Sequence, residues 1–250
     1  MTDILGWRAT FGVVTPSTNT VVQPEYDTMR PVGVTNHVSR IHIPDDPIKS
    51  DKDFDILIQR IDVALDAALE RVLTARPDHL ILGISAESIW GGGTSAAAAI
   101  AQRVRKMAGD VPFTQAADAL PAALKAYGVK GPIALLTPYF PVAEPHLRDF
   151  LNELGYDVAG MRHLSRSSPV DIAKTTIETL RNALTELNTP DVAAIVQFGA
   201  NLPFGRLAAR AEDWLGKPVI AINTATYWHA LRSSGFNDRI EGLGRLLSEF

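Results

Sequence analysis

Short apolar runs alternate with longer segments of helical periodicity along the whole chain. The first half contains four such runs that are typical of strands, at residues 10–14, 34–43, 79–84 and 111–114. Between them, residues 54–75 repeat apolar side chains at helical spacing until Arg76-Pro77 ends the pattern, and residues 95–108 predict another helix. Because the strands are almost continuously apolar, they predict a parallel sheet that helices cover on both faces.

The second half repeats this plan, with predicted strands at residues 132–137, 192–199 and 217–223. Thr137-Pro138 ends a strand as Thr15-Pro16 does, VAAIVQFGANLP resembles HLILGISAES, and KPVIAINTAT resembles VPFTQAADAL. The repeat predicts an α/β fold of two pseudo-symmetric lobes, each a short parallel sheet flanked by helices, with the active site in the cleft between them. We expect residues 1–115 plus 220–250 to form the first lobe and residues 116–219 the second, so that a helix at residues 226–233 crosses back to the first lobe.

Polar residues gather where four of these strands end, at residues 15–20, 85–93, 137–139 and 199–202. Ligands of parallel α/β sheets bind beyond the carboxyl ends of the strands. A helix that starts there presents unpaired N–H groups and a partial positive charge, which suit a carboxylate or phosphate. Ser17, Thr18 and Asn19 are also favoured helix caps, and the triple glycine at 91–93 belongs to no P-loop motif. Two lobes with two polar strand ends each favour a shared binding site.

Composition narrows the classes of partner. The 250 residues are 46% hydrophobic and carry a net charge of −4, with no basic stretch interleaved with aromatic residues, which argues against nucleic acid. No apolar run is long enough to span a bilayer, and the N-terminus lacks the pattern of a signal peptide. A cytoplasmic protein that binds neither nucleic acid nor membrane is therefore the expectation, with a homo-oligomer left open.

The chain contains no cysteine, which excludes disulfides, thiolate metal sites and cysteine nucleophiles together. Its six histidines show no metal-ligand spacing, so no metal site is expected.

Several segments resemble one branch of the aspartate/glutamate racemase superfamily, that of the maleate isomerases and arylmalonate decarboxylases. They are GVVTPSTNTVVQPEYDTM, PVGVTNHVSRI, LLTPYFPVAEP, FGANLP, KPVIAINTATYWHALR and GLGRLL, and they span nearly the whole chain. The resemblance implies two lobes of similar fold, a cofactor-free site between them and small mono- or dicarboxylate substrates. It also implies catalytic cysteines, which would fall at Ile84 or Ser85 and at Gly199.

Without thiols, racemisation by two cysteines and cysteine-type isomerisation are disfavoured, and a carboxylate-binding apparatus remains. We expect Thr15, Ser17 and Asn19 to hold one carboxylate and Tyr139 to donate to another oxygen. The remaining candidates are the Ser85 and Ser88 hydroxyls and the Gly199, Ala200 and Asn201 segment, as an oxyanion pocket, and Glu87, as an acid or base. Glu87 is equally compatible with a solvated or helix-capping carboxylate. Arg40 and His229 are weaker candidates for the cleft.

The resulting hypothesis is a cofactor-independent lyase or isomerase that acts on a small carboxylic acid through an enediolate-like intermediate, as a decarboxylase does, in a catabolic pathway. Three alternatives stay open: a maleate isomerase-like enzyme, a hydrolase of carbon–carbon or carbon–nitrogen bonds with Glu87 as base, and a carboxylate-binding protein without catalysis.

Overall fold

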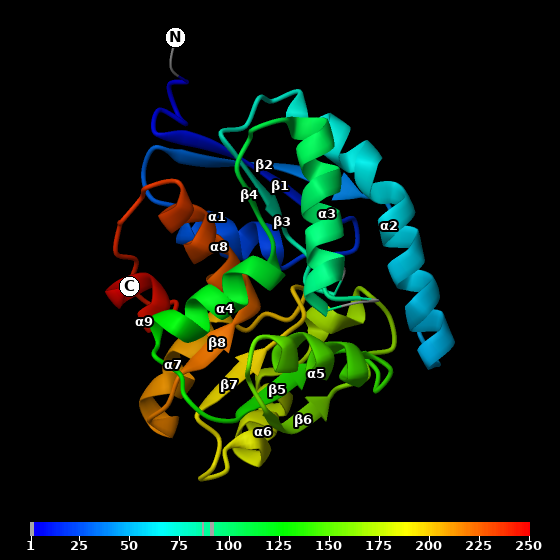
Figure 1. The fold of residues 1–250 in the computed structure, drawn as a ribbon, viewed down its shortest axis with the longest axis vertical. Coiled ribbons are helices and arrows are strands. Elements are labelled where there is room, and N and C mark those ends of the chain that lie inside the picture. The colour runs from blue at the N-terminus through cyan, green and yellow to red at the C-terminus, as the bar shows by residue number, and fades with distance from the viewer. Residues whose placement is uncertain (1–2, 87, 91–92) are drawn as a thin grey trace.

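The computed structural model describes residues 3–86, 88–90 and 93–250 and contains two four-stranded parallel sheets (Figure 1). The first sheet has the order β2-β1-β3-β4 and the second the order β6-β5-β7-β8, so both follow the same topology. The strands are β1 Ala9–Pro16, β2 Val34–Ile41, β3 His79–Leu82, β4 Phe113–Thr114, β5 Ile133–Thr137, β6 Val158–His163, β7 Ala194–Gln197 and β8 Val219–Ala221. The predicted α/β architecture with two related lobes is confirmed.

Helices cover both sheets (Figure 1). They are α1 Val22–Met29, α2 Asp51–Leu73, α3 Gly93–Ala108, α4 Ala116–Ala126, α5 Ala143–Glu153, α6 Ile177–Leu187, α7 Gly205–Leu215, α8 Ile222–Ser233 and α9 Arg245–Glu249, with a 3-10 turn at Asp171–Lys174. The longest, α2, is capped by Ser50, whose hydroxyl accepts a hydrogen bond from Asp53 N–H. No described helix combines the length and apolar character that crossing a bilayer requires.

The interior strands are buried because sheets with helices on both faces have no solvent side. All side chains of β3, β5 and β7 are buried. The inner stripe of α2, which includes Leu65, Leu69 and Val72, packs on the first sheet beside Leu80 and Leu82. Each such side chain contributes about 1.5–3 kcal/mol when it is fully buried, so this stripe fixes α2 over the sheet.

The C-terminal segment connects the lobes. Helix α8 follows β8 of the second sheet without a loop, yet it packs on α4 and contacts β3 and β4 of the first sheet. Tyr227 on α8 lies against Phe11 of β1 and Tyr26 of α1, with ring centroids 5.9 and 4.8 Å apart. As a result α8 carries residues from the end of the second sheet into the first lobe.

Most element boundaries differ from the sequence prediction by a few residues, and two differences are larger or bear on the cavity. The strand predicted at 217–223 ends at Ala221, and Asn223 lies in the first turn of α8. The edge strand β6 was not predicted, because its side chains are half-buried or exposed and leave no continuous apolar run.

A buried histidine at the start of β3 makes stability depend on pH. His79 is 1% exposed. Its Nε2 lies 2.9 Å from Thr114 Oγ1, and its Nδ1 lies 2.9 Å from Ser234 Oγ. Burial, aided by the neighbouring His229, lowers the pKa of His79 to about 4. In the unfolded chain the pKa of a histidine is about 6.5, so the unfolded state binds a proton at a higher pH than the folded state does.

We therefore expect the free energy of unfolding to fall by about 3 kcal/mol as the pH decreases from about 6.5 to about 4, at 1.36 kcal/mol per pKa unit. Urea unfolding across this range measures it. The loss should be smaller in His79→Gln and unchanged in His37→Gln, since His37 is exposed. An equal loss in all three proteins would assign the acid sensitivity to other groups.

Candidate functional site

A cavity of about 60 Å³ lies between the lobes, beyond the carboxyl ends of β1, β3, β5 and β7. Residues from both lobes line it: Pro16, Thr18, Asn19, Ile43, Phe54, Leu57, Ile58, Ile61, Ile84, Ala86, Pro138, Tyr139, Pro169, Ile172, Gly199, Ala200 and Asn201. The structure thus brings the polar ends of four strands to one cavity, and Asn19 and Tyr139 share it.

Two residues that line this cavity, Tyr139 and Ala200, form a hydrogen-bonded cluster across the lobes with Ser85, which lies beside the cavity. Ser85 Oγ lies 3.0 Å from Tyr139 Oη and accepts a hydrogen bond of 3.2 Å from Ala200 N–H. Ser85 follows β3 in the first sheet, whereas Tyr139 and Ala200 follow β5 and β7 in the second. Phe54 of α2 packs beside the tyrosine, with ring centroids 5.0 Å apart, and holds it in place. The cluster joins the ends of β3, β5 and β7 through these two hydrogen bonds.

Asn19 caps α1 and also faces the cavity. Its Oδ1 accepts hydrogen bonds of 2.9 Å from both Val21 N–H and Val22 N–H. The amide nitrogen therefore points the other way, and none of the described residues accepts a hydrogen bond from it. Asn19 is only 4% exposed, so a donor at this place suits a ligand oxygen. Capping and binding are compatible roles for this one side chain.

Asn201 links the two lobes. Its Oδ1 accepts from Thr20 N–H at 3.0 Å, and its Nδ2 donates to Pro169 O at 2.8 Å and to Thr18 O at 3.4 Å. Because both ends of the amide are occupied within the protein, the side chain holds the cavity walls together, and only its backbone remains for a ligand.

Other predicted site residues bond the protein itself and do not line the cavity. Thr15 Oγ1 donates to Gly83 O at 2.8 Å, Ser88 Oγ donates to Ser85 O at 2.9 Å, and Ser17 Oγ exchanges hydrogen bonds with the backbone of Ile43. Arg40 binds Asn19 O and Gln23, and His229 lies 3.0 Å from Thr114 Oγ1. These contacts position the strand ends.

Glu87, the predicted acid or base, lies outside the described residues.

Gly199 leaves no room for a side chain. Its φ of +133° is a conformation that other residues rarely adopt, and a Cβ there would lie 2.3 Å from Pro138 Cδ. Its carbonyl is held by the Gln197 side chain at 2.8 Å. The proline ring therefore occupies the space that a thiol at residue 199 would need.

The rest of the cavity is apolar. Phe54, Leu57, Ile58 and Ile61 of α2 form one wall, and further isoleucines complete it. Among the described lining residues none is Arg, Lys or His. The sequence predicted these α2 positions only as a helical core stripe, because a residue that lines a cavity and one that packs in a core have the same periodicity.

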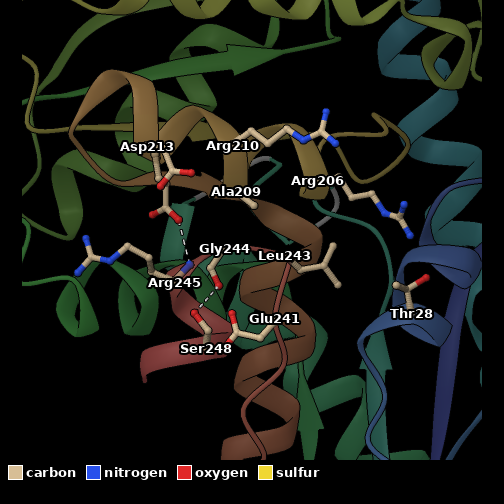
Figure 2. A pocket seen from close by; sticks show the side chains of 12 residues that line it. Thr28, Arg206, Ala209, Arg210, Asp213, Glu241, Leu243, Gly244, Arg245 and Ser248 are labelled. Carbon is tan, nitrogen blue, oxygen red and sulfur yellow. Dashed lines mark hydrogen bonds between the residues drawn. The ribbon is translucent and has the colours of Figure 1, made fainter.

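A second, wider hollow of about 450 Å³ lies beside α7 and α9 (Figure 2). Buried Glu212 accepts a hydrogen bond from Arg245 N–H at 2.9 Å, and burial raises the pKa of this carboxyl. Figure 2 shows Arg206 and Arg245 on opposite sides of the hollow, extending away from each other. The charges here do not converge on a point, so we assign no site to it.

Comparison with known proteins relates this architecture to enzymes. The arylmalonate decarboxylase family model matches residues 63–247. The chain is 25% identical to the maleate isomerase of Alcaligenes faecalis over 249 residues, which cover 95% of each protein. A cysteine-to-serine variant of Nocardia farcinica maleate cis-trans isomerase with a covalently bound succinylcysteine intermediate superposes with a TM-score of 0.86 at 22% identity, covering 96% of this chain and 98% of that one. Unliganded arylmalonate decarboxylase superposes with a TM-score of 0.73 at 23% identity, covering 95% of this chain and 98% of that one.

These similarities confirm the superfamily branch that the sequence motifs resemble. The two solved structures share the fold of this protein across nearly its whole length. Since the family model also covers well over half of the sequence, the chain belongs to the arylmalonate decarboxylase family.

Proposed function

We propose that this protein is a cofactor-independent decarboxylase-type lyase for small acids that carry an apolar substituent next to the carboxylate. The observation that supports this is the mixed lining of the cavity. Asn19, Tyr139 and Asn201 bring polar groups to it, and the apolar side chains of Phe54, Leu57, Ile58 and Ile61 of α2 line it as well. Hydrogen-bond donors stabilise the negative charge that develops on a carboxylate oxygen when an enediolate forms.

In this reaction the bond between Cα and one carboxyl group breaks, and its electron pair passes to Cα and the retained carboxylate. Carbon dioxide leaves, and a proton then adds to Cα. The leaving carboxylate lies against apolar side chains, where a charge is poorly solvated, so its loss as neutral carbon dioxide is favoured. Tyr139 and Asn19 donate to the oxygens of the retained carboxylate, and Glu87 is the proposed proton donor.

Maleate fits this cavity less well. A second carboxylate that stays on the substrate would lie among Phe54, Ile58 and Ile84 with no cationic partner among the described lining residues. Burial of an unpaired charge is strongly unfavourable. The chain also contains no cysteine, so it cannot form a succinylcysteine adduct like that bound in the Nocardia farcinica enzyme variant. Both points favour decarboxylation over cis-trans isomerisation.

The test is incubation of the protein with methylmalonate, phenylmalonate and maleate in D₂O, followed by NMR. We expect the substituted malonates to release carbon dioxide and to gain one deuterium at Cα, with maleate unchanged. Conversion of maleate to fumarate would overturn the proposal. Binding of the malonates without turnover would instead support the carboxylate-binding alternative.

A further inference from the structure

A partly buried carboxylate on α1 connects helices of both lobes. Glu25 Oε1 accepts a hydrogen bond of 3.0 Å from Gly205 N–H at the start of α7, and its Oε2 accepts one of 2.7 Å from Asn223 Nδ2 on α8. Burial raises the pKa of Glu25, while these hydrogen bonds oppose the shift. The chain thus keeps an acid in a place where its charge is poorly solvated, which calls for a specific role.

Asn223 connects Glu25 to the wall of the cavity through two hydrogen bonds. The amide nitrogen carries two hydrogens. One is donated to Glu25, and the other to Ala200 O at 2.9 Å. Asn223 is 3% exposed and has no freedom to turn while both bonds persist. The Glu25 carboxylate therefore sets the orientation of the group that holds the Ala200 carbonyl.

The direction of that carbonyl determines the direction of the next N–H. The peptide unit that joins Ala200 to Asn201 is planar and trans, so its C=O and N–H point to opposite sides. With the carbonyl bound to Asn223, the Asn201 N–H points away from α8. Ala200 and Asn201 both line the cavity, and none of the described residues accepts a hydrogen bond from Asn201 N–H. The amide is left available for a substrate oxygen.

We propose that Glu25 is a positioning residue which, through Asn223, aims the Asn201 N–H at the oxyanion of the substrate. This inference rests on the proposed function, because it concerns the same cavity. This positioning role requires that both side-chain oxygens of Glu25 accept a hydrogen bond. A glutamine at this position keeps one acceptor and turns its NH₂ toward either Gly205 N–H or Asn223 Nδ2, so one of the two bonds is lost.

The experiment compares the wild type with Glu25→Gln and Asn223→Ala. Asp27→Asn is the matched control, since Asp27 is an exposed acid on the same helix whose carboxylate binds Asn36. Two readouts are used: the ¹H–¹⁵N resonance of Asn201, with and without isobutyrate as the probe, and the kinetics of phenylmalonate decarboxylation. We expect both site variants to shift the Asn201 resonance and to weaken the response of that resonance to isobutyrate.

The kinetic effect should fall on kcat, by about tenfold, with KM changed less than threefold, because an oxyanion donor acts mainly on the transition state. Asp27→Asn should match the wild type in both readouts. An Asn201 resonance and probe response that are unchanged in Glu25→Gln would overturn the positioning role. Failure of the wild type to decarboxylate any malonate would overturn the proposed function instead, and the resonance measurement would still decide on Glu25.

Discussion

Replacing Gly199 by cysteine will destabilise the protein by several kcal/mol and will not restore a working thiol site. The new Cβ would lie 2.3 Å from Pro138 Cδ and 2.6 Å from its Cγ, a separation that real Cβ atoms do not show. Overpacking costs about 1–3 kcal/mol, and a side chain at the φ of +133° adds about 1–3 kcal/mol of backbone strain. Urea unfolding of the variant measures the sum.

Two further variants separate the clash from the strain. Gly155→Ala is the matched control, because Gly155 has a φ of +83° but no atom within 4 Å of its ideal Cβ. Gly155→Ala should lose only the stability that corresponds to backbone strain, because its new side chain meets no other atom. Pro138→Ala combined with Gly199→Cys removes the ring and should recover part of the stability lost by the single variant. A Gly199→Cys protein as stable as Gly155→Ala would show that Pro138 does not exclude a side chain here.

Replacing Tyr139 by phenylalanine is expected to lower kcat/KM by about ten- to a hundredfold. A hydrogen bond to a charged group is worth roughly 1.5–3 kcal/mol, and 1.36 kcal/mol corresponds to one decade of rate. The ring still packs against Phe54, and Ser85 Oγ keeps its hydrogen bond from Ala200 N–H. The melting temperature should therefore fall by only a few degrees, for a loss of about 1 kcal/mol.

Tyr227→Phe serves as the control for the loss of a buried hydroxyl. Tyr227 donates to Asn36 Oδ1 at 3.0 Å, and it does not line the cavity. Its variant should lose a similar amount of stability and keep full turnover. The comparison needs kcat/KM for phenylmalonate and thermal unfolding of both variants side by side. A Tyr139→Phe protein that keeps full activity would reduce Tyr139 to a structural residue.

The α/β architecture with two lobes could be predicted from the sequence alone. The runs that became β1, β3, β5 and β7 are mostly apolar because these strands are buried on both faces. Parallel strands bring their carboxyl ends to one edge of a sheet, so the polar residues that follow the strands of each sheet were expected to lie together. The absence of cysteine is likewise a property of sequence alone, and it excludes thiol chemistry without any coordinates.

Which polar groups line the cavity and which are hydrogen-bonded within the protein could be learned only from the three-dimensional structure. Asn201 binds Thr20, which lies 181 residues away in the chain, and Glu25 reaches Asn223 across 198 residues. No local pattern encodes such partners, because a hydrogen bond between distant residues depends on how two lobes pack. The same holds for Pro138, whose ring fills the space above Gly199, and for the face of α2 that lines the cavity. Their neighbours in space are distant in sequence, and periodicity reports only that a side chain is buried, never what it is buried against.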